Sequence, residues 1–282
     1  MLKILVSDKT FVQEGIVLKY RILGKTGLKV SILGFGGIPI RRVSEKEAVA
    51  VVNHAIDVGV NFIHTSITYG DSATKIGLVM KERRDECFLA VKIGGRTKVE
   101  AEDTLKKSLE ALNTNHIEIA ELPINASEFH NVMAPNGAYE AFERAKDDGV
   151  IDFIGITSHD VKFLNDVIPT KSFSNLITPF NYVATTAREK LLSVANKLDM
   201  GIIAMKTLGK GGLSNVSQAL RYVLNQDIDT AIVGMNKKTE VEQNVSTAEN
   251  LHPLTEGEKH SLQQRAAEII KANRLSSSGA VL

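Results

Sequence analysis

Two ionisable side chains follow two consecutive apolar segments of this 282-residue chain. Residues 60–63 lead through a few polar residues to Tyr69, and residues 88–91 are followed at once by Lys92. Packing alone does not explain why two buried-looking strands both end in ionisable groups. In a barrel of parallel strands, the carboxyl ends of the strands are where catalytic residues lie. The spacing therefore predicts a shared catalytic site that contains Tyr69 and Lys92.

The composition is typical of a globular protein with a large core, because 43% of the residues are hydrophobic and 24% are charged. Lys and Arg number 34 against 33 Asp and Glu. This balance disfavours nucleic acid or an anionic membrane as the main partner. No apolar run approaches the roughly 20 residues that span a bilayer. The single cysteine, Cys87, and the charged amino-terminal segment without a signal peptide predict a cytoplasmic protein.

Apolar segments alternate with helical patterns along most of the chain. Helical patterns are marked by signals such as the capping box that Ser44 and Glu47 form. Strands that are apolar on both faces belong to a covered parallel sheet, and eight of them predict a (β/α)8 TIM barrel. An open doubly wound sheet is the alternative, but its GxGxxG turn is missing after the first strand. The predicted strands are residues 32–35, 60–63, 88–91, 117–122, 151–156, 176–180, 202–205 and 230–233.

The chain is predicted to form one domain over residues 19–282, preceded by an extension of unknown role at residues 1–18. Residues 20–31 read as a β-hairpin with glycines at its turn. Residues 255–271 read as a capped carboxyl-terminal helix. The loop at residues 126–134 and the tail after the last helix are expected to set substrate specificity.

Several motifs in chain order resemble those of the aldo-keto reductase family, over almost everything after residue 19. The resemblance implies a TIM-barrel oxidoreductase that transfers a hydride from NADPH or NADH to a small carbonyl substrate. The run GAYEAFERAKDDGVIDFIGITSHD is most similar to prokaryotic members that often carry an iron–sulfur tail, although one cysteine cannot hold a cluster. The other matching runs are YRILGKTGLKVSILGFGG, GVNFIHTSITYGDS, AVKIGGRT and IVGMNKKTEVEQN.

The family uses an Asp, a Tyr, a Lys and a His at its catalytic strand ends. By resemblance, Tyr69 is the proton donor and Lys92 assists it, because a phenol becomes a useful acid only when a neighbouring ammonium stabilises the phenolate. His64 stands where the family has the aspartate, and we expect either a modified catalytic role or a structural one. Pro123 stands where the family has the histidine, and we take it as non-catalytic because it has no side-chain donor.

The resemblance also implies how the dinucleotide is held. Hydroxyl and amide groups after the fifth and sixth strands would bond the carboxamide. A glycine-rich loop would wrap the pyrophosphate, and a helix start would take the adenosine end. Glu240 stands where many NADPH-using members have an arginine, so the choice between NADPH and NADH stays open. The predicted cofactor-binding residues are Gly37, Ile38, Thr157, Ser158, Asn181, Lys206, Thr207, Leu208, Gly209, Gly211, Met235, Asn236, Lys237, Glu240, Gln243 and Asn244.

Three functions fit these observations. The first is an NAD(P)H-dependent reductase with Tyr69 as proton donor. The second is a catalytically impaired dinucleotide-binding barrel that acts as a sensor or subunit, because His64 and Pro123 alter half of the catalytic set. The third is a lyase or isomerase that forms a Schiff base on Lys92. No metal site is predicted, because the histidines lack ligand spacing with carboxylates or Cys87. Neither the oligomeric state nor the individual substrate is predicted.

Overall fold

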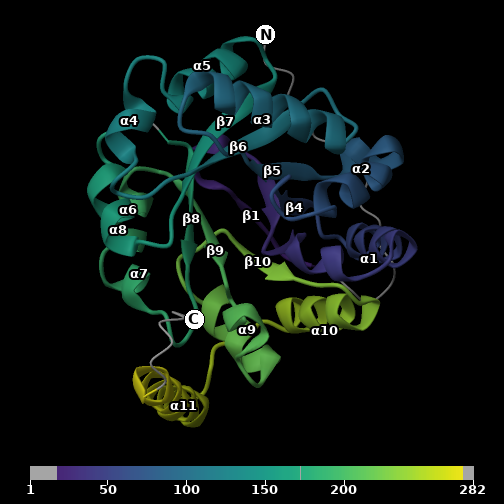
Figure 1. Ribbon diagram of the computed structural model, residues 1–282. Helices are drawn as coiled ribbons and strands as arrows, with labels where there is room; N and C mark the ends of the chain where they lie inside the picture. The colour runs from purple at the N-terminus through teal and green to yellow at the C-terminus, as the bar shows by residue number, and fades with distance from the viewer. Residues whose placement is uncertain (1–17, 172, 276–282) are drawn as a thin grey trace.

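Eight parallel strands close into a barrel in the order β10-β3-β4-β5-β6-β7-β8-β9 (Figure 1). The computed structural model describes residues 18–171 and 173–275. This architecture confirms the predicted (β/α)8 TIM barrel. The barrel strands are β3 (Leu33–Gly36), β4 (Phe62–Thr65), β5 (Phe88–Lys92), β6 (Ile117–Pro123), β7 (Ile151–Thr157), β8 (Asn175–Pro179), β9 (Gly201–Met205) and β10 (Thr230–Gly234).

Helices surround the barrel and bury their apolar faces against it (Figure 1). The predicted capping box is confirmed, since Ser44 and Glu47 bond each other's backbone at the start of the first helix. Residues 186–197 form two short helices instead of one, because Lys190 between them leaves the helical region with φ −144°. The helices are α1 (Glu45–Asp57), α2 (Ser72–Arg83), α3 (Lys98–Ala111), α4 (Phe129–Met133), α5 (Ala138–Asp147), α6 (Val161–Val167), α7 (Thr186–Glu189), α8 (Leu191–Lys197), α9 (Val216–Leu224), α10 (Lys238–Glu249) and α11 (Glu256–Leu275).

A β-hairpin closes the amino-terminal end of the barrel. Its strands β1 (Tyr20–Ile22) and β2 (Lys29–Ser31) pair antiparallel, as predicted, and β1 lies across the ring in Figure 1. Leu23, next to the turn, packs into the barrel interior with residues such as Phe62 of β4. Gly24 has φ +43°, and a side chain there would meet the Gly201 nitrogen at 2.3 Å. Glycine is therefore required at the point where the hairpin meets β9.

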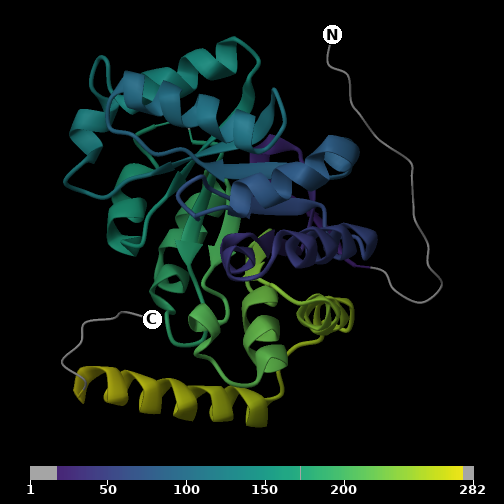
Figure 2. The same ribbon diagram turned by 45° about the vertical axis from the view of Figure 1, so that its right-hand side comes forward.

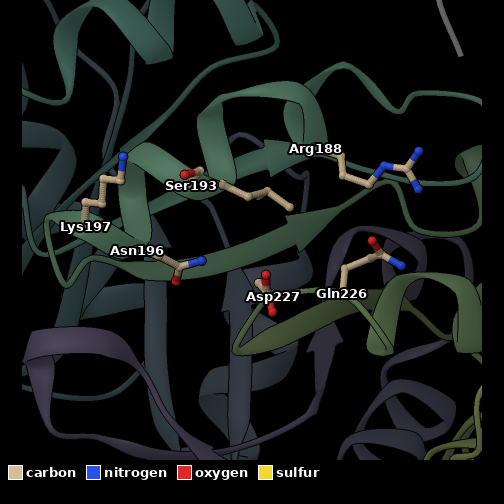
Figure 3. Close-up of a pocket in the computed structure, with 7 residues that line it drawn as sticks. Arg188, Ser193, Asn196, Lys197, Gln226 and Asp227 are labelled. Carbon is tan, nitrogen blue, oxygen red and sulfur yellow. The ribbon is translucent and has the colours of Figure 1, made fainter.

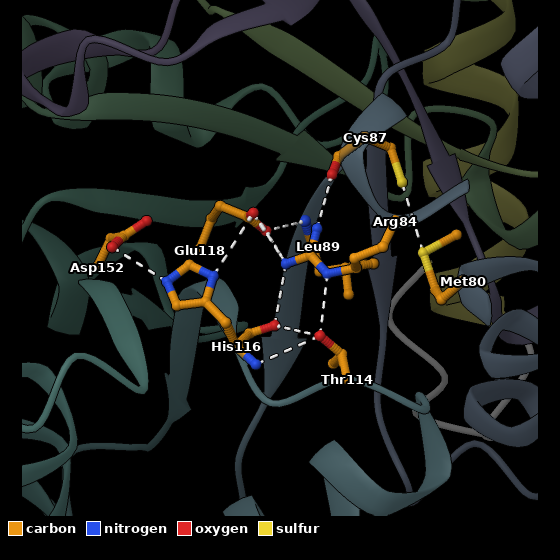
Figure 4. Close-up of polar contacts among 8 residues, drawn as sticks. All are labelled: Met80, Arg84, Cys87, Leu89, Thr114, His116, Glu118 and Asp152. Carbon is orange, nitrogen blue, oxygen red and sulfur yellow. Dashed lines mark hydrogen bonds and ion pairs between the residues drawn. The ribbon is translucent and has the colours of Figure 1, made fainter. Parts of the chain in front are cut away.

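An ion-pair network ties the same end of the barrel together (Figure 4). Both terminal nitrogens of Arg84 find acceptors, and one of them bonds both carboxylate oxygens of Glu118 on β6, at 2.8 and 2.9 Å. Glu118 also accepts from the Leu89 N–H of β5 at 2.7 Å. His116 contacts Asp152 of β7 at 3.1 Å, and this carboxylate raises the pKa of His116. These ionisable groups satisfy one another, so we assign them a structural role.

The last helix, α11, runs along one side of the molecule beside α9 (Figure 2). Leu262 packs with Tyr182 and Leu213 from the loops that follow β8 and β9. Arg221 of α9 anchors the start of the helix through Glu258, at 2.6 Å. None of the described helices combines the length and the apolar character that a membrane crossing requires. Residues 1–17 of the predicted extension, and the tail expected to influence specificity, lie outside the described residues.

Candidate active site

Tyr69 and Lys92 lie side by side at the carboxyl end of the barrel. Lys92 is the last residue of β5, and its ammonium lies 5.9 Å from the centroid of the Tyr69 ring. Ser66 fixes this arrangement, because its carbonyl accepts from the Tyr69 N–H at 3.1 Å and its hydroxyl donates to the Lys92 carbonyl at 3.1 Å. The structure therefore brings together the two ionisable groups that the strand spacing singled out.

Alternation along the strands explains why further polar groups point into the barrel. Phe62, Ala90 and Ile119 form part of an apolar interior layer on β4, β5 and β6. Successive side chains of a strand face opposite sides, so the residues two positions further on also face inward. These residues are His64, Lys92 and Glu121. One polar layer thus lies directly above an apolar one on three neighbouring strands.

His64 is a neutral member of this layer. Its imidazole is 5% exposed, and its ring centroid lies 6.1 Å from that of Tyr69. Burial and the nearby Lys92 ammonium lower the pKa of His64 well below its usual range. The ring is therefore uncharged at neutral pH and does not repel Lys92. Its Nε2 is buried without a hydrogen-bond partner among the described residues.

Pro123 ends β6 in register with Thr157 of β7. Its carbonyl accepts from the Arg96 guanidinium at 3.3 Å, and it offers no side-chain donor to the barrel mouth. Two residues earlier, Glu121 is completely buried and faces Lys92 across the β5–β6 ladder. Glu121 was not among the residues predicted for the site. The signal that could have found it is an acidic residue at an inward position of an otherwise apolar strand.

The residues predicted to hold the carboxamide lie at the ends of β7 and β8. Thr157 and Ser158 are 2% and 7% exposed, and the Thr157 hydroxyl has no partner among the described residues. Asn181 is fully buried, and its amide donates to the Lys206 carbonyl at 2.9 Å. The Asn181 side-chain oxygen accepts from two backbone N–H groups of the following loop. In this structure Asn181 therefore holds the loop rather than presenting a free amide oxygen.

Positive charge gathers over the loop that follows β9. Burial lowers the pKa of His159 to about 4, together with the charges of Lys206, Lys92 and Lys210. Burial, Lys210 and Lys92 also lower the pKa of Lys206. None of the three lysines has a salt bridge within the described part of the chain. The mouth therefore carries unbalanced positive charge, which favours an anionic ligand.

The same loop has an unusual backbone. Lys206, Gly209, Lys210 and Gly211 all have positive φ, between 55° and 89°. Successive residues of this kind can turn N–H groups toward an anion. Here the N–H groups of Gly209 and Gly211 donate to carbonyls within the loop, at 2.9 Å each. Thr207 is buried, and its hydroxyl donates to a β10 carbonyl at 3.3 Å.

The predicted adenosine-binding residues lie around the start of α10. Glu240 accepts from the Asn236 N–H at 2.8 Å, so its carboxylate caps the loop. Lys237 and Gln243 are exposed. Asn244 is 2% exposed, and its side-chain oxygen has no partner among the described residues. Of the remaining members of the predicted set, Met235 and Gly37 are buried, Leu208 is half-buried and Ile38 is 44% exposed.

Two surface pockets lie away from the predicted site. Figure 3 shows a pocket of about 460 Å³ on the outer wall, lined by residues that include Arg188, Asn196 and Asp227. A second pocket of about 700 Å³ lies between α2 and α3. Neither contains a residue of the predicted site. Within the described ranges, no three His, Cys, Asp or Glu residues gather as a metal site would require.

Comparison with known proteins places this geometry in a family. The aldo/keto reductase family model matches residues 32–218. The chain is 26% identical to L-galactose dehydrogenase of Arabidopsis thaliana over 84% of this chain and 90% of that protein. It is 24% identical to the uncharacterized oxidoreductase YqkF of Bacillus subtilis over 91% of this chain and all of that protein.

Solved structures show the same fold. The holo form of an aldo-keto reductase from Bacillus halodurans has a TM-score of 0.78, with 22% identity over 88% of this chain and 96% of that one. An aldo-keto reductase from Klebsiella pneumoniae in complex with NADPH has a TM-score of 0.76, with 18% identity over 89% of this chain and 96% of that one. Because the family model covers well over half of the sequence, the chain belongs to the aldo/keto reductase family.

Proposed function

We propose that this protein is an NAD(P)H-dependent carbonyl reductase in which Tyr69 donates the proton and Lys92 assists it. The observation that carries the proposal is the Lys92 ammonium 5.9 Å from the Tyr69 ring, at the carboxyl end of the barrel. Membership of the aldo/keto reductase family supports it. The related Klebsiella pneumoniae structure, which contains NADPH, supports the choice of cofactor.

The described residues fit a nicotinamide dinucleotide in part. Lys206 and Lys210, which have no salt bridge to a described residue, suit its phosphates. The side-chain oxygens of Thr157 and Asn244, which have no partner among the described residues, suit polar contacts with its two ends. Asn181 and the N–H groups of Gly209 and Gly211 are already bonded, so binding through them requires the loop to rearrange. The iron–sulfur relationship of the branch stays a prediction.

The chain's own residues would handle the proton. When bound, the reduced nicotinamide would supply a hydride to the carbonyl carbon. The Tyr69 hydroxyl would donate its proton to the carbonyl oxygen as negative charge develops there. The Lys92 ammonium stabilises the resulting phenolate. Because Pro123 has no side-chain donor, the substrate oxygen would depend on Tyr69 more heavily than with a full catalytic set.

The test combines binding and turnover. NADPH and NADH are titrated by fluorescence, and reduction is then followed across aldehydes, ketones and quinones. Tyr69→Phe is expected to lower kcat by about 10²–10⁴-fold, the usual contribution of a positioned acid, and to leave dinucleotide affinity unchanged. Tyr20→Phe, in the hairpin at the opposite end, is the matched control and is expected to retain full turnover. Unchanged turnover in Tyr69→Phe would refute the assignment.

The second candidate is a dinucleotide-binding barrel without catalysis. Two observations favour it: His64 carries no charge that could hold Lys92, and Pro123 has no donor for a substrate. It predicts tight dinucleotide binding with no reduction anywhere in the panel. The same titration settles the NADPH or NADH preference, which Glu240 and Lys237 influence in opposite directions.

A further inference from the structure

An acid and an amide meet inside the barrel below the Tyr69–Lys92 pair. Glu121 of β6 and Asn175 of β8 are both 0% exposed. The Asn175 amide nitrogen donates to one carboxyl oxygen of Glu121, Oε1, at 2.5 Å. The other carboxyl oxygen, Oε2, and the Asn175 side-chain oxygen are both buried without a partner in the described chain. Buried acceptors in this state need an explanation.

Gly155 of β7 shows that the two unpartnered oxygens crowd the same place. A side-chain carbon built on Gly155 would lie 2.4 Å from Glu121 Oε2 and 2.5 Å from the Asn175 oxygen. Two acceptors therefore converge with no donor between them. A proton on Oε2 turns it into a donor to the Asn175 oxygen, and the carboxyl and amide then form two reciprocal hydrogen bonds. One added proton thus satisfies both buried oxygens.

The charged surroundings of Glu121 are simple. Lys92 lies opposite it in the β5–β6 register and, among the described residues, is the one charged group that acts on its carboxyl. β7 presents Gly155 and β8 presents Asn175, and neither residue titrates. Lys92 itself interacts with His64, His159 and Lys206, which are neutral or basic. Glu121 is therefore the acidic group of this set.

We propose that Glu121 is a positioning residue that sets how strongly Lys92 activates Tyr69. As a neutral acid paired with Asn175, Glu121 leaves the ammonium charge of Lys92 free to stabilise the Tyr69 phenolate. As a carboxylate, it offsets part of that charge and makes Tyr69 a weaker acid. The carboxyl partner of the lysine thus lies on β6, across from the β4 position that His64 occupies. This inference rests on the proposed function.

The direction of the pH dependence follows. Burial raises the pKa of Glu121 to about 8, against the opposing effects of the Asn175 hydrogen bond and the Lys92 charge. Below that pH Glu121 is neutral and reduction proceeds at its full rate. Above it the carboxylate forms, and kcat/KM for reduction falls to a lower plateau. A coupling of one pKa unit between two groups corresponds to an about tenfold change, which is the size of decrease we expect.

Glu121→Gln is the variant that separates charge from packing. Glutamine has the shape of the acid and can form the same two hydrogen bonds with Asn175, but it does not titrate in this range. We expect the decrease in kcat/KM around pH 8 to disappear. Glu118→Gln, on the outer face of the same strand, is the control and should keep the wild-type profile. An unchanged profile in Glu121→Gln would overturn the proposal, while loss of turnover in Tyr69→Phe would leave the proposed function intact.

A second measurement does not depend on turnover. The side-chain carboxyl carbons of glutamate are followed by NMR as the pH is raised, and Glu121→Gln assigns its signal. We expect one glutamate to titrate near pH 8. Lys92→Met should move its midpoint upward by about one unit, because a neighbouring cation favours the carboxylate, and Lys98→Met on α3 should not. A Glu121 midpoint below pH 5, or one insensitive to Lys92→Met, would contradict the inference even if no substrate is found.

Discussion

The two ends of the barrel are built from the same strands and have opposite chemistry. At the amino end, the hairpin fills the opening with Leu23 and the Arg84 network gives its guanidinium nitrogens carboxylate and carbonyl acceptors. At the carboxyl end, Lys92 has no counter-ion in the described chain, and His64 and Thr157 keep buried polar atoms without partners. Groups that satisfy one another stabilise a fold, whereas unsatisfied groups are held ready for a ligand.

Substitutions destabilise the two ends for different physical reasons. The amino end depends on close backbone approach, where a small steric change is severe. The carboxyl end depends on buried titratable groups, where the effect of a change varies with pH. Variants at the two ends should therefore differ in the kind of response as well as in its size.

The largest effect is expected at the closed end. Gly24→Ala forces a side chain against the Gly201 nitrogen and strains a positive φ, so we expect a loss of about 3 kcal/mol in the free energy of unfolding. Gly27→Ala in the same turn is the control, because its φ is +70° but nothing lies within 4 Å. That variant should lose only about 1 kcal/mol. Urea unfolding measures both, and equal losses would show that the contact with β9 is unimportant.

The next largest effect is the decrease in the free energy of unfolding that Glu121 causes as the pH rises. Its pKa is raised from 4.5 to about 8, so the folded state keeps a proton that the unfolded chain releases. This contribution is fully present below pH 4.5 and is lost as the pH rises through 8, and over the measured interval from pH 6.5 to 8 the loss is up to about 2 kcal/mol. Glu121→Gln should remove that slope. Denaturation series between pH 6.5 and 8 test it, and a wild-type slope in the variant would be the contrary result.

His64 has the opposite effect, because it lowers the free energy of unfolding as the pH falls. Its pKa is lowered on folding, so its contribution is present above the unfolded value of about 6.5 and is lost as the pH falls below it. As the pH falls below about 6.5, the loss from His64 therefore offsets the gain from Glu121. His64→Gln should therefore leave a protein whose stability decreases with pH across the whole interval up to 8. A variant that still loses stability on acidification from pH 6.5 would contradict this account.

The smallest effect concerns repulsion among the lysines. Lys210→Gln removes one of the charges that lower the pKa of His159, so the imidazole midpoint should rise from about 4 toward its usual value. Stability should rise by no more than about 0.5 kcal/mol, since Lys210 is exposed. NMR of the imidazole protons follows the shift. Lys171→Gln is the control, and an equal shift in it would show that the effect is not local.

Much of the barrel follows from local patterns. Strands that are apolar on both faces and helices with capping signals depend on neighbouring residues, so the eight strands and the hairpin were predictable. The exact ends of the strands were harder to predict. β4 spans Phe62–Thr65 rather than residues 60–63, because the sheet pairs continue through the polar residues at the mouth. His64 accordingly lies within the strand and not beyond it.

The site was predictable only in part. The pairing of Tyr69 with Lys92 followed from two strand ends that share one edge of the barrel. The state of Asn181 did not, because a sequence does not show whether an amide is free or already caps a loop. The buried environment of the Glu121 carboxyl could not be predicted either, because it depends on Asn175, 54 residues away along the chain, and on a glycine between them. Contacts of this range are set by barrel closure, which no local pattern records.

Gly155 has a consequence for the descent of the protein. A methyl group there would overlap the carboxyl of Glu121 and the amide of Asn175. Three positions on three strands are thus linked, since position 155 cannot enlarge while the acid and the amide persist. In relatives whose β7 carries a bulkier residue at this point, the acid and the amide should be missing together, so the trio should be inherited or discarded as one unit.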